Sequence, residues 1–266
     1  MLTIAGTDPS GGAGIQADIK TFSALGAYAA SVVTALVAQN TRGVRSFQVI
    51  DAGFVAEQID AVFDDLRIDA VKIGMVATRE IAATIADRLL HHHARNIVLD
   101  PVMVAKSGDR LLAEDAVAAL RERLIPAADV ITPNLPEAAV LLGEPPPATL
   151  AAMRATVRRM GSLGARWVLL KGGHLAGDES PDLLFDGHAI TEFPARRIAT
   201  KNTHGGGCTL SSAIAALLPR CAMAEAVERA KTYVTAALAA SGELSVGSGH
   251  GPLHHFHALW ARENLP

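Results

Sequence analysis

Cysteine, aromatic residues and long hydrophobic runs are all scarce in this chain. Its 266 residues include two cysteines, Cys208 and Cys221, and only 4% of the residues are aromatic. Two thiols do not build a disulfide scaffold, so we expect a reduced, cytoplasmic protein. No apolar run approaches the roughly 20 residues that a helix needs to cross a bilayer. A charge and a proline at positions 8 and 9 also argue against a secretory leader, and we expect no membrane partner.

Blocks of basic residues are missing as well. The formal net charge is −3, and lysine and arginine occur singly or in pairs. This distribution gives no electrostatic footprint for nucleic acid, so we expect no nucleic-acid partner. What the chain does have is a hydrophobic content of 50%, dominated by small aliphatic residues. That composition is typical of buried parallel strands covered by alanine-rich helices.

Short apolar runs alternate with amphipathic segments along most of the chain. This order predicts right-handed βαβ units, and hence an α/β protein with a mostly parallel central sheet flanked by helices. No linker or internal repeat interrupts the pattern, so we interpret residues 1–266 as a single domain. The expected strands are residues 2–6, 31–39, 70–74, 96–101, 129–134 and 167–173, and the expected helices are residues 15–25, 55–66, 79–92, 113–124, 135–142 and 150–163.

The pattern changes after residue 173. Residues 182–193 predict a small antiparallel hairpin that turns at Asp186 and Gly187, because glycine accepts a positive φ there. Two long helices are expected to follow. One begins at a run of glycines near residue 205, and the other spans about residues 222–241.

Glycine and polar residues gather where the predicted strands end. In an open α/β sheet the carboxyl ends of the strands share one edge with helix N-termini, and ligands bind at that edge. We therefore expect one site there, formed by six short clusters: Gly6-Thr7-Asp8, Gln39-Asn40, Gly74-Met75, Asp100-Pro101-Val102, Asn134 and Lys171-Gly172-Gly173.

The first glycine loop, GTDPSGGAGIQAD at residues 6–18, matches two phosphate-binding motifs only in part. Gly12 and Ala13 stand where a Walker A loop needs Lys and Ser or Thr. A dinucleotide fingerprint fits residues 12–17, but no acidic residue follows about 20 positions later. The loop is either a tight turn or a substrate contact that uses Asp8 and Asp18. We favour the substrate contact.

The second glycine loop lies within KNTHGGGCTLSSAIAALL, residues 201–218. Three consecutive glycines at 205–207 allow the backbone N–H groups to form a concave anion site, which the N-terminus of the following helix would reinforce. A plain turn before a helix is the alternative. In the anion site, Cys208 would sit at a helix N-terminus, where its thiol is expected to be more acidic than usual and partly thiolate.

Several motifs in series are similar to those of a known family. They are IAGTDPSGGAGIQADIKTF, VTALVAQNT, VKIGM, LDPVMVAKSG, ITPNLPEA, LLKGGH, NTHGGGCTLSSAIAA and SGHGPLHHFHALW. From residue 3 to about residue 260, the chain resembles the hydroxymethylpyrimidine/phosphomethylpyrimidine kinases of thiamine biosynthesis, which are ribokinase-like enzymes. The resemblance implies ATP and Mg²⁺, phosphorylation of an aminopyrimidine alcohol and then of its monophosphate, and a homodimer.

The resemblance also implies roles for individual residues. Gln39 would hold the pyrimidine ring edge, Lys171 would lie near the ATP phosphates, and Glu137 would organise Mg²⁺ through water. The anion site at Gly205, Gly206, Gly207 and Cys208 would carry catalysis. The remaining implied residues are Gly6, Asp18, Val37, Met75 and Val102 around the pyrimidine, and Asn134 and Thr203 around ATP.

Two positions in the second loop set this chain apart. Gly206 replaces a threonine that is usual in the family, which removes a hydroxyl and loosens the loop. Many ribokinase-like relatives have an aspartate base where this chain has Cys208. Phosphoryl transfer depends more on positioning and charge cancellation than on a strong base, and an incoming phosphate monoester is already ionised. Our hypothesis is that a thiol, which does not repel that dianion, lets one pocket serve both steps.

Three alternatives remain from the sequence. A vitamin B6 kinase of the same fold would accept a similar flat ring that carries a hydroxymethyl group. A cysteine hydrolase or acyl-transfer enzyme would pair Cys208 with His204. A pyrimidine sensor without catalysis would not need Lys171, Glu137 and Cys208 together.

Overall fold

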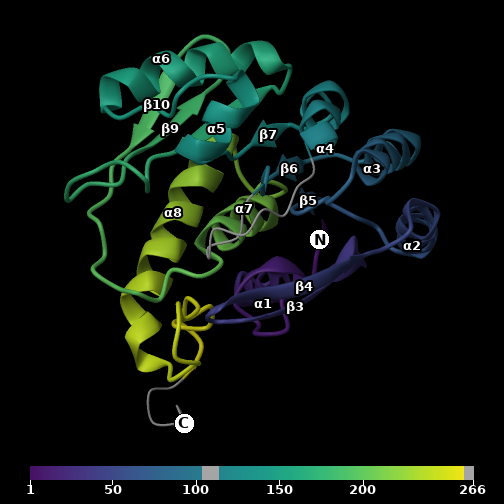
Figure 1. Ribbon diagram of the computed structural model, residues 1–266, viewed down its shortest axis with the longest axis horizontal. Coiled ribbons are helices and arrows are strands. Elements are labelled where there is room, and N and C mark those ends of the chain that lie inside the picture. Colours follow the sequence, from purple (N-terminus) through teal and green to yellow (C-terminus); the bar gives the residue numbers. More distant parts are fainter. Residues whose placement is uncertain (104–113, 261–266) are drawn as a thin grey trace.

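The centre of the molecule is an eight-stranded sheet in a computed structural model that describes residues 1–103 and 114–260. Its strands are β1 (Leu2–Ala5), β2 (Ala30–Val33), β5 (Val71–Ile73), β6 (Ile97–Leu99), β7 (Val130–Ile131), β8 (Trp167–Lys171), β9 (Asp182–Phe185) and β10 (Ile190–Phe193). They lie in the order β10-β9-β8-β7-β6-β5-β1-β2 (Figure 1). Neighbours from β2 to β8 are parallel, and β9 and β10 add an antiparallel edge. The predicted α/β fold with a mostly parallel sheet is confirmed.

Helices cover both faces of this sheet. One face packs against α2 (Ala52–Asp65), α3 (Arg79–His91), α4 (Glu114–Ala119), α5 (Leu135–Leu142) and α6 (Leu150–Met160), and the other packs against α1 (Gly14–Ala24), α7 (Gly206–Leu217) and α8 (Met223–Ala239). Successive side chains of a strand point to opposite faces. In β6, Ile97 and Leu99 pack on the first face, whereas Val98 packs on the second. Because both faces are covered, the strands read as continuous apolar runs.

The strand predicted at residues 31–39 is wrong as a single element. β2 ends at Val33, and β3 (Ala35–Asn40) leaves the main sheet to pair antiparallel with β4 (Gly43–Val49) in a separate two-stranded sheet. β4 is not predictable from the sequence, because most of its side chains are exposed and it has no buried stripe. The β3–β4 hairpin projects toward the C-terminal part of the chain (Figure 1).

Other predicted elements agree with the structure to within a few residues. The hairpin predicted at residues 182–193 is confirmed as β9 and β10, with Asp186 Oδ1 accepting hydrogen bonds from two turn amides. The helix predicted at residues 222–241 ends at Ala239 and continues as a 3-10 turn. The predicted helix start at residue 113, and residues 104–108 of the family resemblance, lie outside the described residues. Within residues 1–103 and 114–260, no helix combines the length and apolarity that a membrane span needs.

Candidate active site

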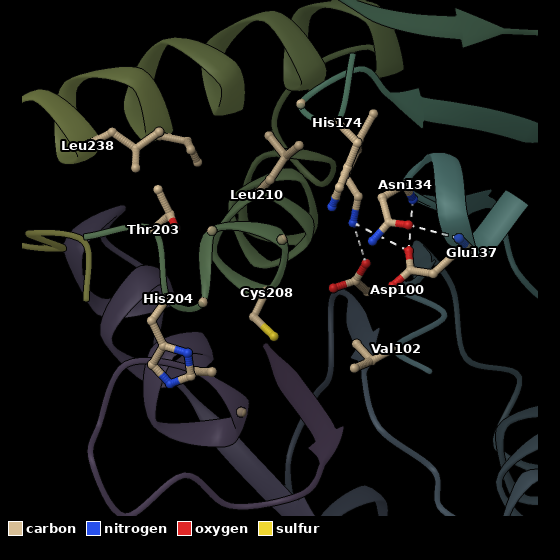
Figure 2. A pocket seen from close by; sticks show the side chains of 18 of the residues that line it. Asp100, Val102, Asn134, Glu137, His174, Thr203, His204, Cys208, Leu210 and Leu238 are labelled. Carbon is tan, nitrogen blue, oxygen red and sulfur yellow. Dashed lines mark hydrogen bonds and ion pairs between the residues drawn. The ribbon is translucent and has the colours of Figure 1, made fainter. Parts of the chain in front are cut away.

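A cavity of about 600 Å³ opens where the parallel strands end. Each of the six strand-end clusters contributes at least one residue to its wall, which confirms that they converge on one site. The first residues of α7 line the same cavity, and Figure 2 shows Cys208 and Asp100 facing it from opposite sides. The wall residues from the six clusters are Gly6, Thr7, Gln39, Met75, Asp100, Val102, Asn134, Lys171 and Gly173.

Lys171, the last residue of β8, lies between two carboxylates. Its Nζ donates to Asp100 Oδ1 at 2.8 Å and is 4.0 Å from Glu137 Oε2. Burial acts to lower the pKa of Lys171, but Asp100 and Glu137 together raise it above its ordinary value. The ammonium group is therefore charged at neutral pH. It places a fixed positive charge at the floor of the cavity.

Asn134 and Glu137 form a capping box at the start of α5. Asn134 Oδ1 accepts from the Glu137 backbone N–H, and Glu137 Oε2 accepts from the Asn134 N–H, both at 2.8 Å (Figure 2). Burial raises the pKa of Glu137 to about 7, and Asp100 adds to this effect while Lys171 opposes it. Glu137 therefore exchanges its proton near neutral pH. The protonation of Glu137 therefore depends on whether a cation or a proton donor enters the cavity.

The predicted second glycine loop forms the N-terminus of α7. Gly205 is the N-cap residue and has a φ of +79°, which favours glycine. Within the described residues, the backbone N–H groups of Gly207 and Cys208 have no hydrogen-bond acceptor. A Cβ atom on Gly207 would lie only 3.1 Å from Lys171 Nζ. The helix N-terminus and the ammonium group thus create one positively polarised corner, which suits an anion.

The expected acidity of Cys208 is wrong. Burial raises the pKa of its thiol to about 11, and the nearby carboxylates of Asp18 and Asp100 add to this effect, while the Lys72 ammonium and the Gly14 N–H oppose it. The favourable field of the helix N-terminus is therefore not enough to produce a thiolate. Cys208 is a neutral thiol at pH 7.

Asp18 does not face the cavity, so the expected contact with a substrate is also wrong. Its carboxylate is fully buried and accepts two hydrogen bonds from Lys72 Nζ, at 2.8 and 2.9 Å. Thr3 and Ser212 donate to the same carboxylate at 2.6 and 2.7 Å. The Asp18 carboxylate raises the pKa of Lys72 above its ordinary value despite the opposing effect of burial. The pair fastens α1 and α7 to the centre of the sheet.

The first glycine loop is organised by Asp8. This buried carboxylate accepts hydrogen bonds from the backbone N–H groups of Ser10, Gly12 and Ala13. His204 Nε2 lies 2.7 Å from Asp8 Oδ2. Although burial opposes it, the hydrogen bonds from His204 and Ser10 hold the pKa of Asp8 well below its usual range. An ionised carboxylate only accepts, so the proton of this contact lies on His204.

The pairing of His204 argues against a cysteine hydrolase. Its Nε2 is engaged by Asp8, and no hydrogen bond joins His204 to Cys208, both of which are described residues. The raised pKa of the Cys208 thiol points the same way, since a nucleophilic cysteine needs a base or a lowered pKa.

Comparisons with known proteins agree with this geometry. A sequence model described as phosphomethylpyrimidine kinase matches residues 8–254. The hydroxymethylpyrimidine/phosphomethylpyrimidine kinase of Escherichia coli K12 is 58% identical over 260 residues, which cover 97% of this chain and 98% of that enzyme. The chain belongs to the phosphomethylpyrimidine kinase family.

Two solved structures are similar to this chain in fold and in sequence. The phosphomethylpyrimidine kinase of Clostridium difficile 630 has a TM-score of 0.78 at 43% identity, over 88% of this chain and 96% of that one. An ADP complex of Bacillus subtilis pyridoxal kinase has a TM-score of 0.90 at 37% identity, over 98% of each chain. The family is therefore shown by sequence. The fold is shared with vitamin B6 kinases.

The cavity of this phosphomethylpyrimidine kinase family member has two sides. One side is formed by five of the residues assigned to the pyrimidine in the sequence analysis: Gly6, Val37, Gln39, Met75 and Val102. The other side includes Thr203, Leu210 and Leu238, which gather above the glycine loop (Figure 2), together with charged residues such as Arg196 and Lys231. Gln39 reaches the first side from β3, where the pairing register with β4 shifts between Ala38 and Gln39. Such an irregularity re-aims the side chains beside it.

Several residues of the cavity wall have no predicted role. Asp100 lies at a predicted strand end, and a carboxylate in the LDPV segment is a usable signal for a site residue. The wall opposite the sheet, formed by Arg196, Ile198, Val234 and Leu238, carried no signal, because these residues come from a loop and an ordinary amphipathic helix. Only the folded chain brings them to the site.

Proposed function

We propose that this chain transfers the γ-phosphoryl group of ATP to 4-amino-5-hydroxymethyl-2-methylpyrimidine, and then a second one to the resulting monophosphate, in thiamine biosynthesis. The observation that supports it most is the corner where the Lys171 ammonium lies beside the N-terminus of α7, whose Gly207 and Cys208 N–H groups have no acceptor in the described part of the chain. Preorganised donors of this kind stabilise the charge that develops on a transferred phosphoryl group.

The two sides of the cavity fit the two substrates. A flat ring would lie against Val37, Met75 and Val102, and the Gln39 amide offers both a donor and an acceptor to its edge. The apolar side chains of Leu210, Val234 and Leu238 on the other side suit the base of a nucleotide. The similar Bacillus subtilis pyridoxal kinase was solved with ADP, which supports a nucleotide in this cavity.

The residues at the sheet edge also fit Mg²⁺. Asp100, Asn134 and Glu137 offer oxygen donors, and Mg²⁺ is usually held by one or two carboxylates together with substrate phosphates and water. Among residues 1–103 and 114–260, no group of three or more His, Cys, Asp or Glu side chains forms a cage of its own. When bound with ATP, Mg²⁺ would neutralise phosphate charge, and Glu137 would hold it through water.

Cys208 serves as a small neutral wall of the anion site in this proposal. Because its thiol keeps its proton at pH 7, the first alcohol is activated by position and by charge cancellation rather than by a thiolate. In the second step the incoming phosphate meets no permanent carboxylate at position 208. This arrangement supports two successive transfers in one pocket.

We further propose that the chain acts as a single kinase domain, as a homodimer, in the cytoplasm. Large apolar side chains are exposed on β3, β4 and α2: Leu36, Phe47, Val49 and Phe54 are 50%, 40%, 42% and 54% exposed. A two-stranded hairpin is marginally stable by itself. A second copy packed on this face would cover these side chains and support the hairpin.

The experiment is a phosphoryl-transfer assay with ATP and Mg²⁺ on three acceptors: the aminopyrimidine alcohol, its monophosphate and pyridoxal. We expect turnover of both pyrimidines, with kcat/KM well above that for pyridoxal. Because the fold matches a pyridoxal kinase with a TM-score of 0.90, pyridoxal is the acceptor to compare. A preference for pyridoxal would replace the proposal with a vitamin B6 kinase. If no phosphoryl group is transferred to any of the three acceptors, the alternative of a pyrimidine sensor without catalysis would replace the proposal.

A further inference from the structure

One glycine-rich segment, residues 247–255 (GSGHGPLHH), has no part in the proposed chemistry. It nevertheless contacts both the turn of the β3–β4 hairpin and the loop that leads into α7. We infer that this segment, which we call the strap, is a positioning element that fixes the pyrimidine-binding hairpin relative to the anion loop. The inference rests on the proposed function only in identifying what those two halves bind. Figure 1 shows the segment in yellow beside the outer end of β3 and β4.

The first half of the strap grips the turn of the β3–β4 hairpin. His250 N–H donates to Thr41 O at 2.8 Å, and Gly249 N–H donates to Thr41 Oγ1 at 3.2 Å. Arg42 Nε donates to Ser248 Oγ at 2.8 Å. A Cβ atom on Gly249 would lie 2.0 Å from Thr41 O, and one on Gly247 would lie 2.3 Å from Thr41 Oγ1. At Gly249 backbone meets backbone, and at Gly247 the Thr41 side chain occupies the space, so neither position has room for a side chain.

The second half of the strap holds the loop that leads into α7. His204 N–H donates to Gly251 O at 3.1 Å, and residues 204 and 252 form an isolated parallel bridge. A Cβ atom on Gly251 would lie 2.4 Å from Asn202 Oδ1. His204 is followed directly by the anion loop at residues 205–208. The strap therefore contacts the chain immediately before that loop.

The far end of the strap is fixed to rigid helices. His255 Nε2 lies 3.1 Å from Thr209 Oγ1 in the first turn of α7, and His255 O accepts from Tyr233 Oη of α8 at 2.6 Å. Leu253 is fully buried, and His254 N–H donates to Ala237 O. The strap is thus anchored on α7 and α8 and holds the hairpin turn from there.

The position of Gln39 depends on the contacts between the strap and the hairpin turn. Thr41 lies two residues after Gln39, and β3 and β4 belong to a sheet separate from the main one. The base of the hairpin is tied to the first glycine loop, where Val37 N–H donates to Thr7 Oγ1 at 2.9 Å. Its outer end is tied by the strap. The strap therefore sets the distance between the ring that Gln39 holds and the amides that hold the phosphoryl group.

Gly249→Ala tests the inference, with Gly242→Ala as the matched control. Gly242 lies in the turn after α8, and a Cβ atom there meets nothing within 4 Å. In Gly249→Ala we expect a several-fold faster amide hydrogen exchange both in residues 36–48 and in residues 203–208. We also expect KM for the pyrimidine to rise and kcat to fall by about tenfold each, because a misplacement of about 1 Å costs orders of magnitude in rate. Gly242→Ala should match the wild-type protein in every readout.

A milder variant covers the case in which Gly249→Ala does not fold. Thr41→Val with Arg42→Ala removes two side-chain hydrogen bonds from a partly exposed turn and should shift the same readouts in the same direction. Faster exchange in the hairpin alone, or an unchanged KM with uniformly lowered stability, overturns the inference. The hydrogen-exchange measurement does not depend on the substrate. If the wild-type protein fails to phosphorylate the pyrimidine, the proposed function is refuted, and the exchange result still tests the role of the strap.

Discussion

His204 Nε2 lies 2.7 Å from Asp8 Oδ2, and this contact joins two glycine loops that are 196 residues apart in sequence. The loops also meet backbone to backbone, since a Cβ atom on Gly205 would lie 1.7 Å from Gly12 O. Asp8 shapes the first loop through three backbone N–H groups while it holds the residue that precedes the second loop. The two loops therefore behave as one structural unit at the floor of the site.

Asp8→Asn should loosen both loops at once. Asparagine keeps one acceptor oxygen, and an NH2 group at the place of Oδ2 cannot accept the hydrogen bonds that Oδ2 accepts from Gly12, Ala13 and His204. We expect the free energy of unfolding to fall by about 1–3 kcal/mol, the cost of leaving buried partners unsatisfied. Urea titration measures this loss. A variant as stable as the wild type, with unchanged kcat, would show that the contact has no role in either loop.

The three glycines of the anion loop should respond differently to alanine. At Gly206 the nearest atom to an added Cβ is 3.9 Å away, whereas Gly205 has a φ of +79° and Gly207 faces Lys171 Nζ at 3.1 Å. Gly206→Ala should stabilise the protein by about 0.4–1 kcal/mol, because it restricts the unfolded chain. Gly206→Thr, which restores the residue usual in the family, should keep full activity. Gly205→Ala should abolish transfer. Thermal unfolding and an ATP-coupled assay on all three variants test these expectations.

Asp18 should prove to be a stability residue and not a binding residue. Lys72→Met leaves the Asp18 carboxylate buried without its partner, and breaking such a pair costs about 3–5 kcal/mol. The double variant Lys72→Met with Asp18→Asn should recover much of that loss. KM for the pyrimidine should stay near the wild-type value in any variant that folds. A KM that rises with Asp18→Asn while stability is unchanged would return Asp18 to the substrate pocket.

The parallel strands β1, β5, β6 and β7 were predictable because they are buried on both faces and the next element after each of them is a helix. The β3–β4 hairpin was not, since β4 is exposed and Ala35–Asn40 continues the apolar run of β2 with only Thr34 between them. The place of the site followed from the strand ends, which every parallel sheet brings to one edge.

The chemistry of individual side chains was harder to predict. Position at a helix N-terminus argued for an acidic Cys208, but the fold buries the thiol, and Asp18 and Asp100, from distant parts of the sequence, add to the rise in its pKa. Asp18 looked like a ligand because it follows a glycine loop, and only the fold reveals that Lys72 lies beneath it. Long-range electrostatics of this kind leave no trace in local sequence.

Cys208→Asp should separate the two phosphorylation steps. A carboxylate at this position would join Asp18 and Asp100, which already disfavour negative charge on the thiol. The first step, on a neutral alcohol, should be retained or improved, because an aspartate can act as a base. The second step should fall by at least tenfold, because like charges repel in a partly buried site. The assay compares kcat/KM on the alcohol and on the monophosphate, with Cys208→Ser as a neutral control. An undiminished second step would mean that charge at position 208 does not govern the dual activity.

Glu137 should make the stability of the protein fall as pH rises toward neutrality. Its folded pKa is about 7, compared with an ordinary value of 4.5, so the folded state holds this proton more tightly than the unfolded state. The contribution is fully present below about pH 4.5, declines as the carboxyl ionises, and is gone above about pH 7. Glu137→Gln removes the titration but keeps an oxygen for the Asn134 N–H. We expect the wild type to lose stability relative to Glu137→Gln between pH 5 and 7 and to run parallel to it above pH 7.5, as measured by urea unfolding at each pH. Parallel curves across the whole range would place the pKa of Glu137 near its ordinary value, and Lys171 would then outweigh burial in this pocket.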